Sequence, residues 1–532
     1  MKLIKQLKLT SLILVIAFCA NPQITFALDV NVTSDTGTTV TNSVTLGNFT
    51  NSATITTSGP DSDGVQNSGT GTITTFTNSG TIIGVDDGIQ NDGTITSLIN
   101  SGRITGTFGV FTSNTATLTT FTNTGTTAGS TYGFLMSGVG STTNVINSGT
   151  ISGTINAIRI ANSGTVNLTL NKGSVLIGDL HVNNTGTLNI TSNVGASKSY
   201  AYTTAGDGTI TLNDLNNRPA VKGSALAINI GSMEMAGENL YQKTANITDA
   251  VDRNVKNNKD TWVEPYYSES TRDSGGDSSQ IRQFKNNKQG VNAGFKVENS
   301  ATPLQVIFNV DQTKNNIDSS EHIINSDSVM IGLTAPSYAK YEGFDVSVKG
   351  LVGYANSKTD RKILDNTTTT GARTLTGEYD SYYAVVGSAL SKNYNLDKDL
   401  NANLTLGVDL TSEFRDSYSE NLYFKYNSLE LIQLQPRIQS EFIKTTGKDS
   451  NVFLTAGVGA REVLSGKTQK YSMNNTGVSF TTPNSGDYYA SLAAGTNMNV
   501  AANVNFYTLV SAKMSDRDTE TYQASIGLKG TF

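Results

Sequence analysis

The last eleven residues read Tyr522-Gln523-Ala524-Ser525-Ile526-Gly527-Leu528-Lys529-Gly530-Thr531-Phe532. Apolar and small residues occupy every second position of this stretch, namely Tyr522, Ala524, Ile526, Leu528, Gly530 and Phe532. Because successive side chains of a β-strand point to opposite faces, the period of two predicts a strand with one apolar face. The final residue of the chain is an aromatic residue on that face.

The same alternation recurs upstream through the second half of the chain. Tyrosine pairs such as Tyr266-Tyr267 and Tyr382-Tyr383 lie near the ends of the alternating segments. Twelve segments of about ten residues are predicted, starting near residues 261, 287, 302, 323, 342, 376, 400, 427, 450, 486, 502 and 520. An even number of such strands is typical of an outer-membrane barrel, since a closed barrel satisfies every backbone group in lipid. A soluble β-sandwich also alternates, but the strand length and the aromatic last residue favour the barrel.

A helix is predicted immediately before the barrel. Leu240, Ile247, Val251 and Val255 follow one another at spacings of seven, four and four residues, which places them on one helix face. Such a helix could cap the preceding structure or enter the barrel. We expect it to enter the barrel.

A short phrase, Asn-Ser-Gly or Asn-Thr-Gly, recurs in the first half of the chain. It begins at Asn78, Asn100, Asn123, Asn147, Asn162 and Asn184. The first four copies follow one another at intervals of about 22 to 24 residues, and the interval between the last two has the same length, which is typical of repeat proteins. A repeat of this length, rich in Thr, Val and Ile and punctuated by Gly, predicts the coils of a parallel β-solenoid.

Each repeat has an apolar residue two positions before the Asn, as in Phe76, Leu98, Phe121 and Val145. We expect these side chains to stack inside the solenoid. The Asn side chains are expected to form a hydrogen-bonded ladder at a corner, where their amides remain partly solvated. Residues 28–200 are predicted to make roughly seven coils.

The ionisable residues of the solenoid give little basis for catalysis. Residues 28–200 contain no Glu and one His, His181, which is expected to be a rung side chain. Paired carboxylates could come from Asp61 and Asp63 or from Asp86 and Asp87. The similar phrases that begin at Asp63 and Asp87 lie one repeat apart, so we expect these Asp residues to cap turns of the repeat. Calcium at stacked Asp residues is the alternative, although the Gly-Gly-x-Gly-x-Asp pattern of calcium-binding solenoids is absent.

The composition excludes several other classes of protein. The formal net charge is -6, and the Lys and Arg residues form no basic stripe, so nucleic-acid binding is not expected. One Cys and two His are too few for the common zinc and iron-sulfur sites. The sequence therefore predicts no catalytic residue, no metal ligand and no cofactor.

The N-terminal segment 1–27 reads as a secretory signal peptide. Three lysines precede an apolar run from Leu9 to Ala20, and small residues precede a predicted cleavage between Ala27 and Leu28. A transmembrane anchor is the alternative, but the run is shorter than the roughly 20 residues that a helical span requires. Cys19 lies in this segment, so the mature chain is expected to contain no cysteine.

The order of these parts resembles the autotransporters, the type V secretion proteins of Gram-negative bacteria. The resemblance covers a signal peptide (1–27), a solenoid passenger (28–200), a linker with a helix (201–260) and a twelve-stranded barrel (261–532). The opening strand Trp262-Val263-Glu264-Pro265-Tyr266-Tyr267 and the stretch Gly290-Val291-Asn292-Ala293-Gly294-Phe295 are similar to that family's translocator. Phe532, Leu528 and Ile526 correspond to the C-terminal signal of the barrel, whereas Gly530 stands where the family has a bulkier apolar residue.

The resemblance implies a mechanism. A monomeric barrel is inserted in outer-membrane lipid by the barrel-assembly machinery, a helix near 224–256 plugs the pore, and the passenger is displayed at the cell surface. The passenger is expected to be a non-enzymatic adhesin or surface structure that binds an unknown surface ligand. An exported hydrolase and a plain pore are the alternatives.

The resemblance also raises the question of release. Some autotransporters cleave themselves at an Asn pair inside the pore, and this chain has Asn257-Asn258. The pair lies only four residues before Trp262, at the start of the first strand rather than within the helix. We therefore expect the passenger to stay attached.

Overall fold

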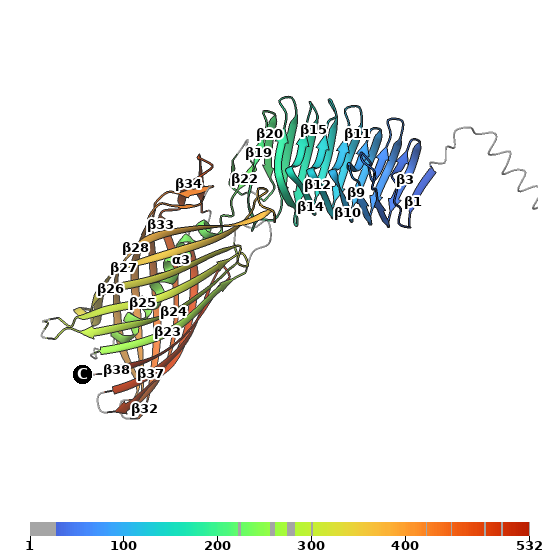
Figure 1. Ribbon diagram of the computed structural model, residues 1–532. Helices are drawn as coiled ribbons and strands as arrows, with labels where there is room; N and C mark the ends of the chain where they lie inside the picture. The colour runs from blue at the N-terminus through green and yellow to red at the C-terminus, as the bar shows by residue number, and fades with distance from the viewer. Residues whose placement is uncertain are drawn as a thin grey trace, which may run out of the picture. The chain divides into compact units, whose positions relative to one another are not determined.

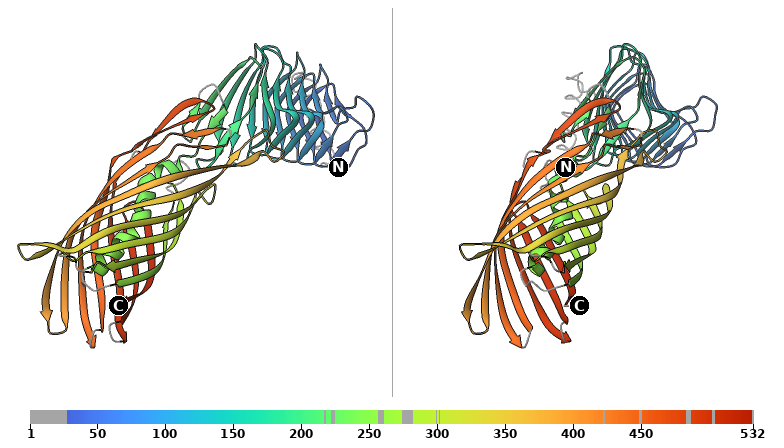
Figure 2. Two further views of the ribbon diagram at one scale, coloured as in Figure 1. Left: turned by 60° about the vertical axis from the view of Figure 1, so that its left-hand side comes forward. Right: turned by 90° about the vertical axis from the view of Figure 1, so that its left-hand side faces the viewer.

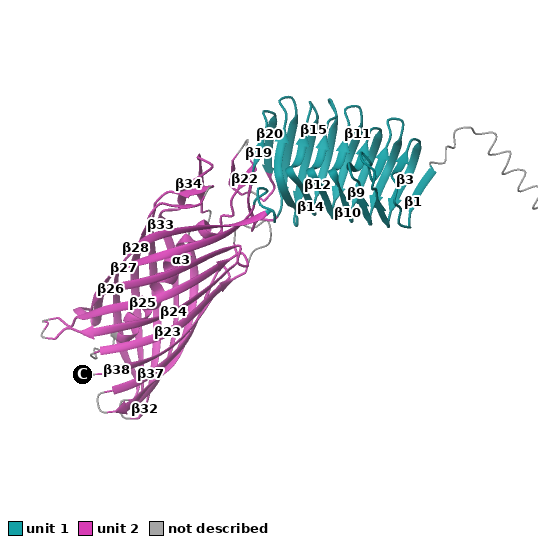
Figure 3. Ribbon diagram, in the orientation of Figure 1, with its two compact units in different colours: residues 1–194, 202–213, 365–371 teal, residues 195–201, 214–364, 372–532 magenta. Residues whose placement is uncertain are grey.

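The computed structural model describes residues 28–216, 218–221, 225–255, 261–273, 282–298, 300, 302–421, 423–447, 450–482, 486–501 and 504–530. The chain forms two compact units (Figure 3). Unit 1 comprises residues 1–194, 202–213 and 365–371, and unit 2 comprises residues 195–201, 214–364 and 372–532. Each unit is described by itself.

Unit 1 is a parallel β-solenoid, as the repeat predicted (Figures 1 and 2). Its first sheet contains nine strands in chain order: β1 (Leu28–Val32), β3 (Thr45–Asn51), β6 (Thr72–Asn78), β9 (Thr94–Asn100), β11 (Thr117–Asn123), β13 (Thr142–Asn147), β15 (Thr165–Asn171), β17 (Thr187–Asn193) and β20 (Thr209–Asp214). Its second sheet contains β2 (Val40–Asn42), β4 (Thr54–Thr56), β5 (Val65–Asn67), β7 (Thr81–Ile83), β8 (Asp87–Asn91), β10 (Arg103–Thr112), β12 (Thr126–Met136), β14 (Thr150–Ile160), β16 (Val175–Val182) and β19 (Thr204–Ala205). Eight strands of the first sheet lie within residues 28–200, against roughly seven expected coils, and β20 continues the ladder beyond residue 200.

One apolar side chain per coil fills the interior of the solenoid. Phe76 pairs with Leu98, Leu98 with Phe121, and Phe121 with Val145, each one coil further on. All four side chains are fully buried. The predicted stack is therefore confirmed, and Phe49 extends it at the N-terminal end, where its ring stacks on that of Phe76 at 4.4 Å.

The asparagine ladder is also confirmed. The side-chain amides of Asn51, Asn78, Asn100 and Asn123 each donate a 2.8 Å hydrogen bond to the Asn side chain of the next coil. The expectation that these amides remain partly solvated is wrong, because Asn78, Asn100 and Asn123 have no exposed surface. Each coil covers the amide of the previous one, so the hydrogen bonds must replace water entirely.

Unit 2 is built on a closed antiparallel barrel (Figures 1 and 2). Among the described residues, twelve strands form the ring: β23 (Thr261–Arg272), β24 (Phe284–Lys296), β25 (Gln305–Ile317), β26 (His322–Tyr341), β27 (Phe344–Leu364), β28 (Ala372–Asp397), β29 (Leu400–Arg415), β32 (Leu429–Gly447), β33 (Ser450–Ser465), β36 (Gly486–Ala501), β37 (Val504–Ser515) and β38 (Thr519–Gly530). Pairing of β23 with β38 closes the ring. The predicted strand starts agree with these bounds, and the largest difference is the sixth strand, predicted near residue 376 and found from Ala372.

Shorter elements complete unit 2. A small antiparallel sheet contains β30 (Tyr418–Glu420), β31 (Phe424–Tyr426), β34 (Thr468–Met473) and β35 (Thr476–Thr481). Strand β18 (Ser199–Tyr202) pairs in parallel with the end of β27, and β21 (Ala220–Val221) pairs with β22 (Ala225–Ala227).

The predicted helix is present but begins later than expected. The short helix α2 (Gly231–Glu234) precedes α3 (Ala236–Val255). Residues 225–227 pair as strand β22 instead of forming the first helical turn. No helix in the described part of the chain is both long and apolar enough to cross a membrane.

Candidate functional site

The outer face of the last barrel strand carries two of the predicted signal residues. Ile526 and Leu528 on β38 point away from the lumen, and their side chains are 55% and 51% exposed. Ser525 and Gln523 alternate with them and are buried inside. The predicted facing of this strand is confirmed. Phe532, the third residue of the proposed signal, lies outside the described residues.

Two other predicted sites fall at the edge of the described chain. Ala27 lies outside it, and Leu28 is the first residue of β1. Asn257 and Asn258 also lie outside the described residues, between the end of α3 and the start of β23. The cleavage of the signal peptide and the self-cleavage of the chain therefore stay predictions.

Helix α3 occupies the lumen of the barrel, as Figure 1 shows. Its buried residues Leu240, Ile247 and Val251 belong to one apolar cluster with inward-facing barrel residues such as Trp262 and Leu351. The face predicted from the spacing of seven and four residues is thus the face that packs inside the barrel. This burial replaces water with close packing along the lumen.

Charged side chains of α3 form ion pairs with side chains of the barrel strands. Six ion pairs reach six different strands: Glu238–Arg461, Lys243–Glu413, Asp249–Lys513, Asp252–Lys349, Asp252–Arg437 and Arg253–Glu264. The N–O distances of the Arg253–Glu264 and Lys243–Glu413 pairs are 2.6 and 3.1 Å. Removing one partner of a buried pair leaves an uncompensated charge and costs about 3–5 kcal/mol. The pairs therefore fix both the depth and the rotation of the helix in the lumen.

The alternation of the barrel strands does not by itself explain why polar side chains that face the lumen are buried. Lumen-facing residues of an open channel contact water, but here the inward-facing Lys288 donates hydrogen bonds to the backbone carbonyls of Gln242 and Lys243 on α3. The inward-facing Ser525 is also buried. A lysine at Ser525 would therefore have to displace the side chains packed around it.

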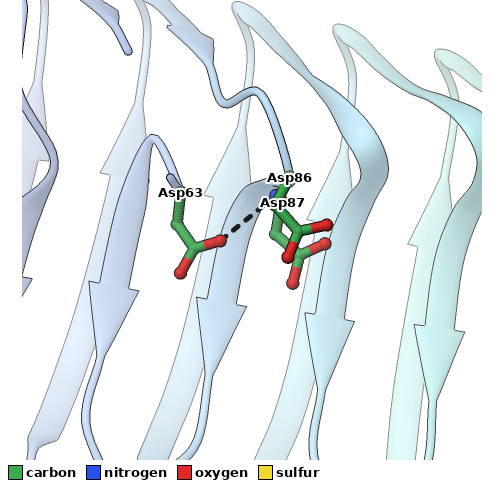
Figure 4. Close-up of side chains that lie close together, drawn as sticks. All are labelled: Asp63, Asp86 and Asp87. Carbon is green, nitrogen blue, oxygen red and sulfur yellow. Dashed lines mark hydrogen bonds between the residues drawn. The ribbon is translucent and has the colours of Figure 1, made fainter. Parts of the chain in front are cut away.

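A cluster of three carboxylates lies in the solenoid (Figure 4). Asp63 precedes β5, whereas Asp86 and Asp87 lie in the next coil at the start of β8. One carboxylate oxygen from each residue lies within 4.8 Å of the other two. The Asp63 carboxylate accepts a 3.2 Å hydrogen bond from the backbone N–H of Asp87. The Asp63 side chain is thus hydrogen-bonded to the neighbouring coil.

Burial makes this cluster electrostatically unfavourable. Desolvation, together with the charges of Asp86, Asp63 and Asp92, raises the pKa of Asp87 to about 8, although a backbone hydrogen bond from Phe108 opposes this shift. Desolvation likewise raises the pKa of Asp63 to about 6, although the hydrogen bond from Asp87 opposes this shift. Three neighbouring carboxylates cannot all be ionised at little cost unless a positive charge or a proton lies among them.

A cluster of aromatic side chains lies on later coils of the same sheet. The Phe108 ring on β10 stacks on that of Tyr132 on β12, with centroids 5.2 Å apart, and contacts Phe111 edge-on. Arg159 on β14 donates a 2.6 Å hydrogen bond to the Tyr132 hydroxyl. All four side chains are partly exposed. In the neighbouring coils, the residues that pair in register with Phe108 and Tyr132 are Asp87 and Asn156.

Comparisons with known proteins identify the barrel. The family model of the autotransporter β-domain matches residues 261–511. Among solved structures, the translocator domain of the autotransporter NalP from Neisseria meningitidis is 14% identical, with 57% of this chain and 100% of that chain covered and a TM-score of 0.43. The transport unit of the autotransporter AIDA-I from Escherichia coli is 10% identical, with 57% and 99% covered and a TM-score of 0.40. No curated protein matches the chain.

Proposed function

Because this chain belongs to the autotransporters, with its barrel in the outer membrane and its solenoid displayed at the cell surface, we propose that the solenoid is a non-enzymatic adhesin. The observation that carries this proposal is the regularity of unit 1. The first sheet continues from β1 to β20, and each strand pairs with the strand of the next coil. A rod of this kind presents side chains along its outer faces without an inserted globular domain in the described residues.

The aromatic cluster of Phe108, Phe111, Tyr132 and Arg159 supports a contact role. Partly exposed aromatic rings and Arg are the residues that contribute most to binding at protein surfaces. Their rings are already ordered by mutual stacking and by the Arg159 hydrogen bond. Little side-chain entropy is therefore lost when a ligand binds.

Adherence of whole cells tests the proposal. Cells that carry the full chain are expected to adhere to epithelial cells or to one another more than cells without it. The double variant Phe108→Ser and Tyr132→Ser is expected to reduce this adherence, whereas Thr119→Ser, at an exposed position on β11, is expected to leave it unchanged. Equal adherence of cells with and without the chain would show that the solenoid is not an adhesin.

The plain pore is the weaker alternative because α3 fills the lumen and is held by six ion pairs. A barrel with this packing should conduct little in planar bilayers. A large steady conductance of the full chain would favour a pore.

The assembly and fate of the chain complete the proposal. The C-terminal segment that contains Ile526, Leu528 and Phe532 is recognised by the barrel-assembly machinery. Passenger and barrel are linked by residues 201–260, of which β20 still continues the solenoid sheet. The passenger stays attached, so mass spectrometry of the surface protein should find a mature chain that begins at Leu28. A barrel fragment that begins at Asn258, and that Asn257→Asp abolishes, would show self-cleavage.

A further inference from the structure

We propose that Asp63, Asp86 and Asp87 bind one divalent cation, and that this cation is Ca²⁺. The proposal does not depend on the adhesive function, although Asp87 pairs in register with Phe108 of the aromatic cluster. It would join two consecutive coils near the N-terminal end of the solenoid.

The first argument is the way in which the fold brings these residues together. Val65 pairs with Ile89, so Asp63 and Asp87 occupy equivalent positions of adjacent coils. Asp86 adds a third carboxylate from the same turn as Asp87. Ligand oxygens within 4.8 Å of one another can contact a single ion at the 2.3–2.6 Å distances typical of Ca²⁺.

The second argument is a buried oxygen without a partner. Asp87 is only 1% exposed, and its Oδ1 has no hydrogen-bond partner. Figure 4 shows its carboxylate beside that of Asp86. A buried carboxylate oxygen of this kind carries a substantial desolvation cost, and a bound cation would remove it.

The third argument is the local charge. Residues 28–194 contain eight Asp, and five of them lie between residues 61 and 92, whereas the Lys and Arg residues of this range are Arg103, Arg159 and Lys172. The charges that act on Asp87 are the carboxylates of Asp86, Asp63 and Asp92. The cluster therefore attracts a cation from the surroundings.

The donor set selects the kind of cation. Carboxylate oxygens suit the hard ions Ca²⁺ and Mg²⁺, whereas His and Cys, which favour zinc and copper, are absent from the cluster. Asp86 is partly exposed, so water can complete the coordination on that side. Mg²⁺ requires nearly ideal octahedral geometry, while Ca²⁺ accepts an irregular set of ligands from two coils.

Calorimetric titration of the full chain in detergent tests the site. After EDTA treatment and desalting, CaCl₂ is titrated into the wild type and into two variants, Asp87→Asn and Asp86→Asn. Each variant is expected to bind one Ca²⁺ fewer per chain than the wild type. Asp179→Asn, a solenoid variant outside the cluster, is expected to retain wild-type binding. Other acidic residues of the chain add the same background to every titration.

Protease digestion provides a second readout of the same site. At about a hundred times its Kd, Ca²⁺ should lower the unfolded population of the coils that it joins about a hundredfold. Digestion of the solenoid should slow accordingly in the wild type and not in Asp87→Asn. The same number of bound Ca²⁺ ions in the wild type and in both cluster variants would overturn the proposal. So would a loss of binding in Asp179→Asn equal to that in Asp87→Asn.

Discussion

The side-chain amide of Asn123 donates a 2.8 Å hydrogen bond to the side chain of Asn147, one coil further along the solenoid, and both side chains are fully buried. Asn123 in turn accepts a hydrogen bond of the same length from Asn100. Beside this ladder lies the apolar stack that includes Phe121. Polar and apolar interior rows therefore run in parallel, and each fixes the register of successive coils.

Truncation of a stacked ring should open the solenoid locally. Phe121→Ala removes a fully buried side chain between Leu98 and Val145 and should cost about 3–5 kcal/mol. Limited proteolysis should find a new cleavage point near β11. The control is Thr119→Ala, at an exposed position of the same strand. Equal resistance of the wild type and Phe121→Ala would contradict the stacked register.

Loss of an amide from the asparagine ladder should also destabilise the solenoid. Because the amide is buried, the loss should be larger than for a partly solvated amide. Asn123→Ala removes two buried 2.8 Å hydrogen bonds of the ladder, from Asn100 and to Asn147. The Asn100 amide keeps acceptors in Thr126 and Thr127, so the loss should lie near the lower end of about 1–3 kcal/mol. Thermal unfolding of the solenoid should show the loss. Asn193→Ala, in an exposed Asn pair at the end of the rod, is the matched control. A larger effect at Asn193 than at Asn123 would count against the buried ladder.

A charge on the lipid-facing side of the barrel should impair insertion. Ile526 is exposed on the outer face of β38, so Ile526→Lys should cost about 2–4 kcal/mol near the middle of the membrane. Heat-modifiable migration of the barrel in outer-membrane fractions measures insertion. Ile526→Val and Ser525→Ala, which introduce no charge, should insert normally. If Ile526→Lys inserts as well as Ile526→Val, the assigned facing of β38 is wrong.

In the presence of a chelator, the stability of the solenoid should fall as the pH rises. The pKa values of Asp87 and Asp63 are raised to about 8 and about 6, whereas unfolded Asp titrates near pH 4. The folded state therefore holds more protons than the unfolded state between about pH 4 and pH 8. Its stability is fully present below this window and decreases through it, by about 1.4 kcal/mol per pH unit for each extra proton.

Chemical denaturation at several pH values with EDTA measures this slope. Asp87→Asn should flatten it, because the amide does not titrate. Asp61→Asn, an exposed residue of the preceding turn, should leave it unchanged. A stability that rises between pH 5 and pH 8 in the wild type would show that these carboxyls are not protonated in the folded chain.

The elements with a strict period were predictable from the sequence. Alternation located the twelve barrel strands, and the Asn-Ser-Gly repeat placed Phe121 between Leu98 and Val145. The spacing of Leu240, Ile247 and Val251 identified the face of α3 that packs in the lumen. In each case one rule of side-chain direction fixes which residues face inward.

Other features depend on contacts between segments distant in the chain. The burial of Asn123 follows from the coils above and below it, and the burial of Lys288 follows from α3, whose carbonyls accept its hydrogen bonds. The contact of Asp63 with Asp86 and Asp87 requires the register of adjacent coils as well as the local turn. Asp63 and Asp87 lie one repeat apart in the sequence, which indicates that they occupy equivalent positions of two coils. It does not indicate that their carboxylates lie close together.

Site-specific labelling on intact cells tests the central claim most directly. The mature chain is expected to contain no cysteine, so Thr119→Cys on the solenoid and Lys398→Cys, in the turn between β28 and β29, each introduce a single thiol. A membrane-impermeant maleimide should label Thr119→Cys on intact cells. It should label Lys398→Cys, in a turn that we expect at the periplasmic end of the barrel, only after the outer membrane is permeabilised. Labelling of Lys398→Cys but not of Thr119→Cys on intact cells would contradict display of the solenoid at the surface.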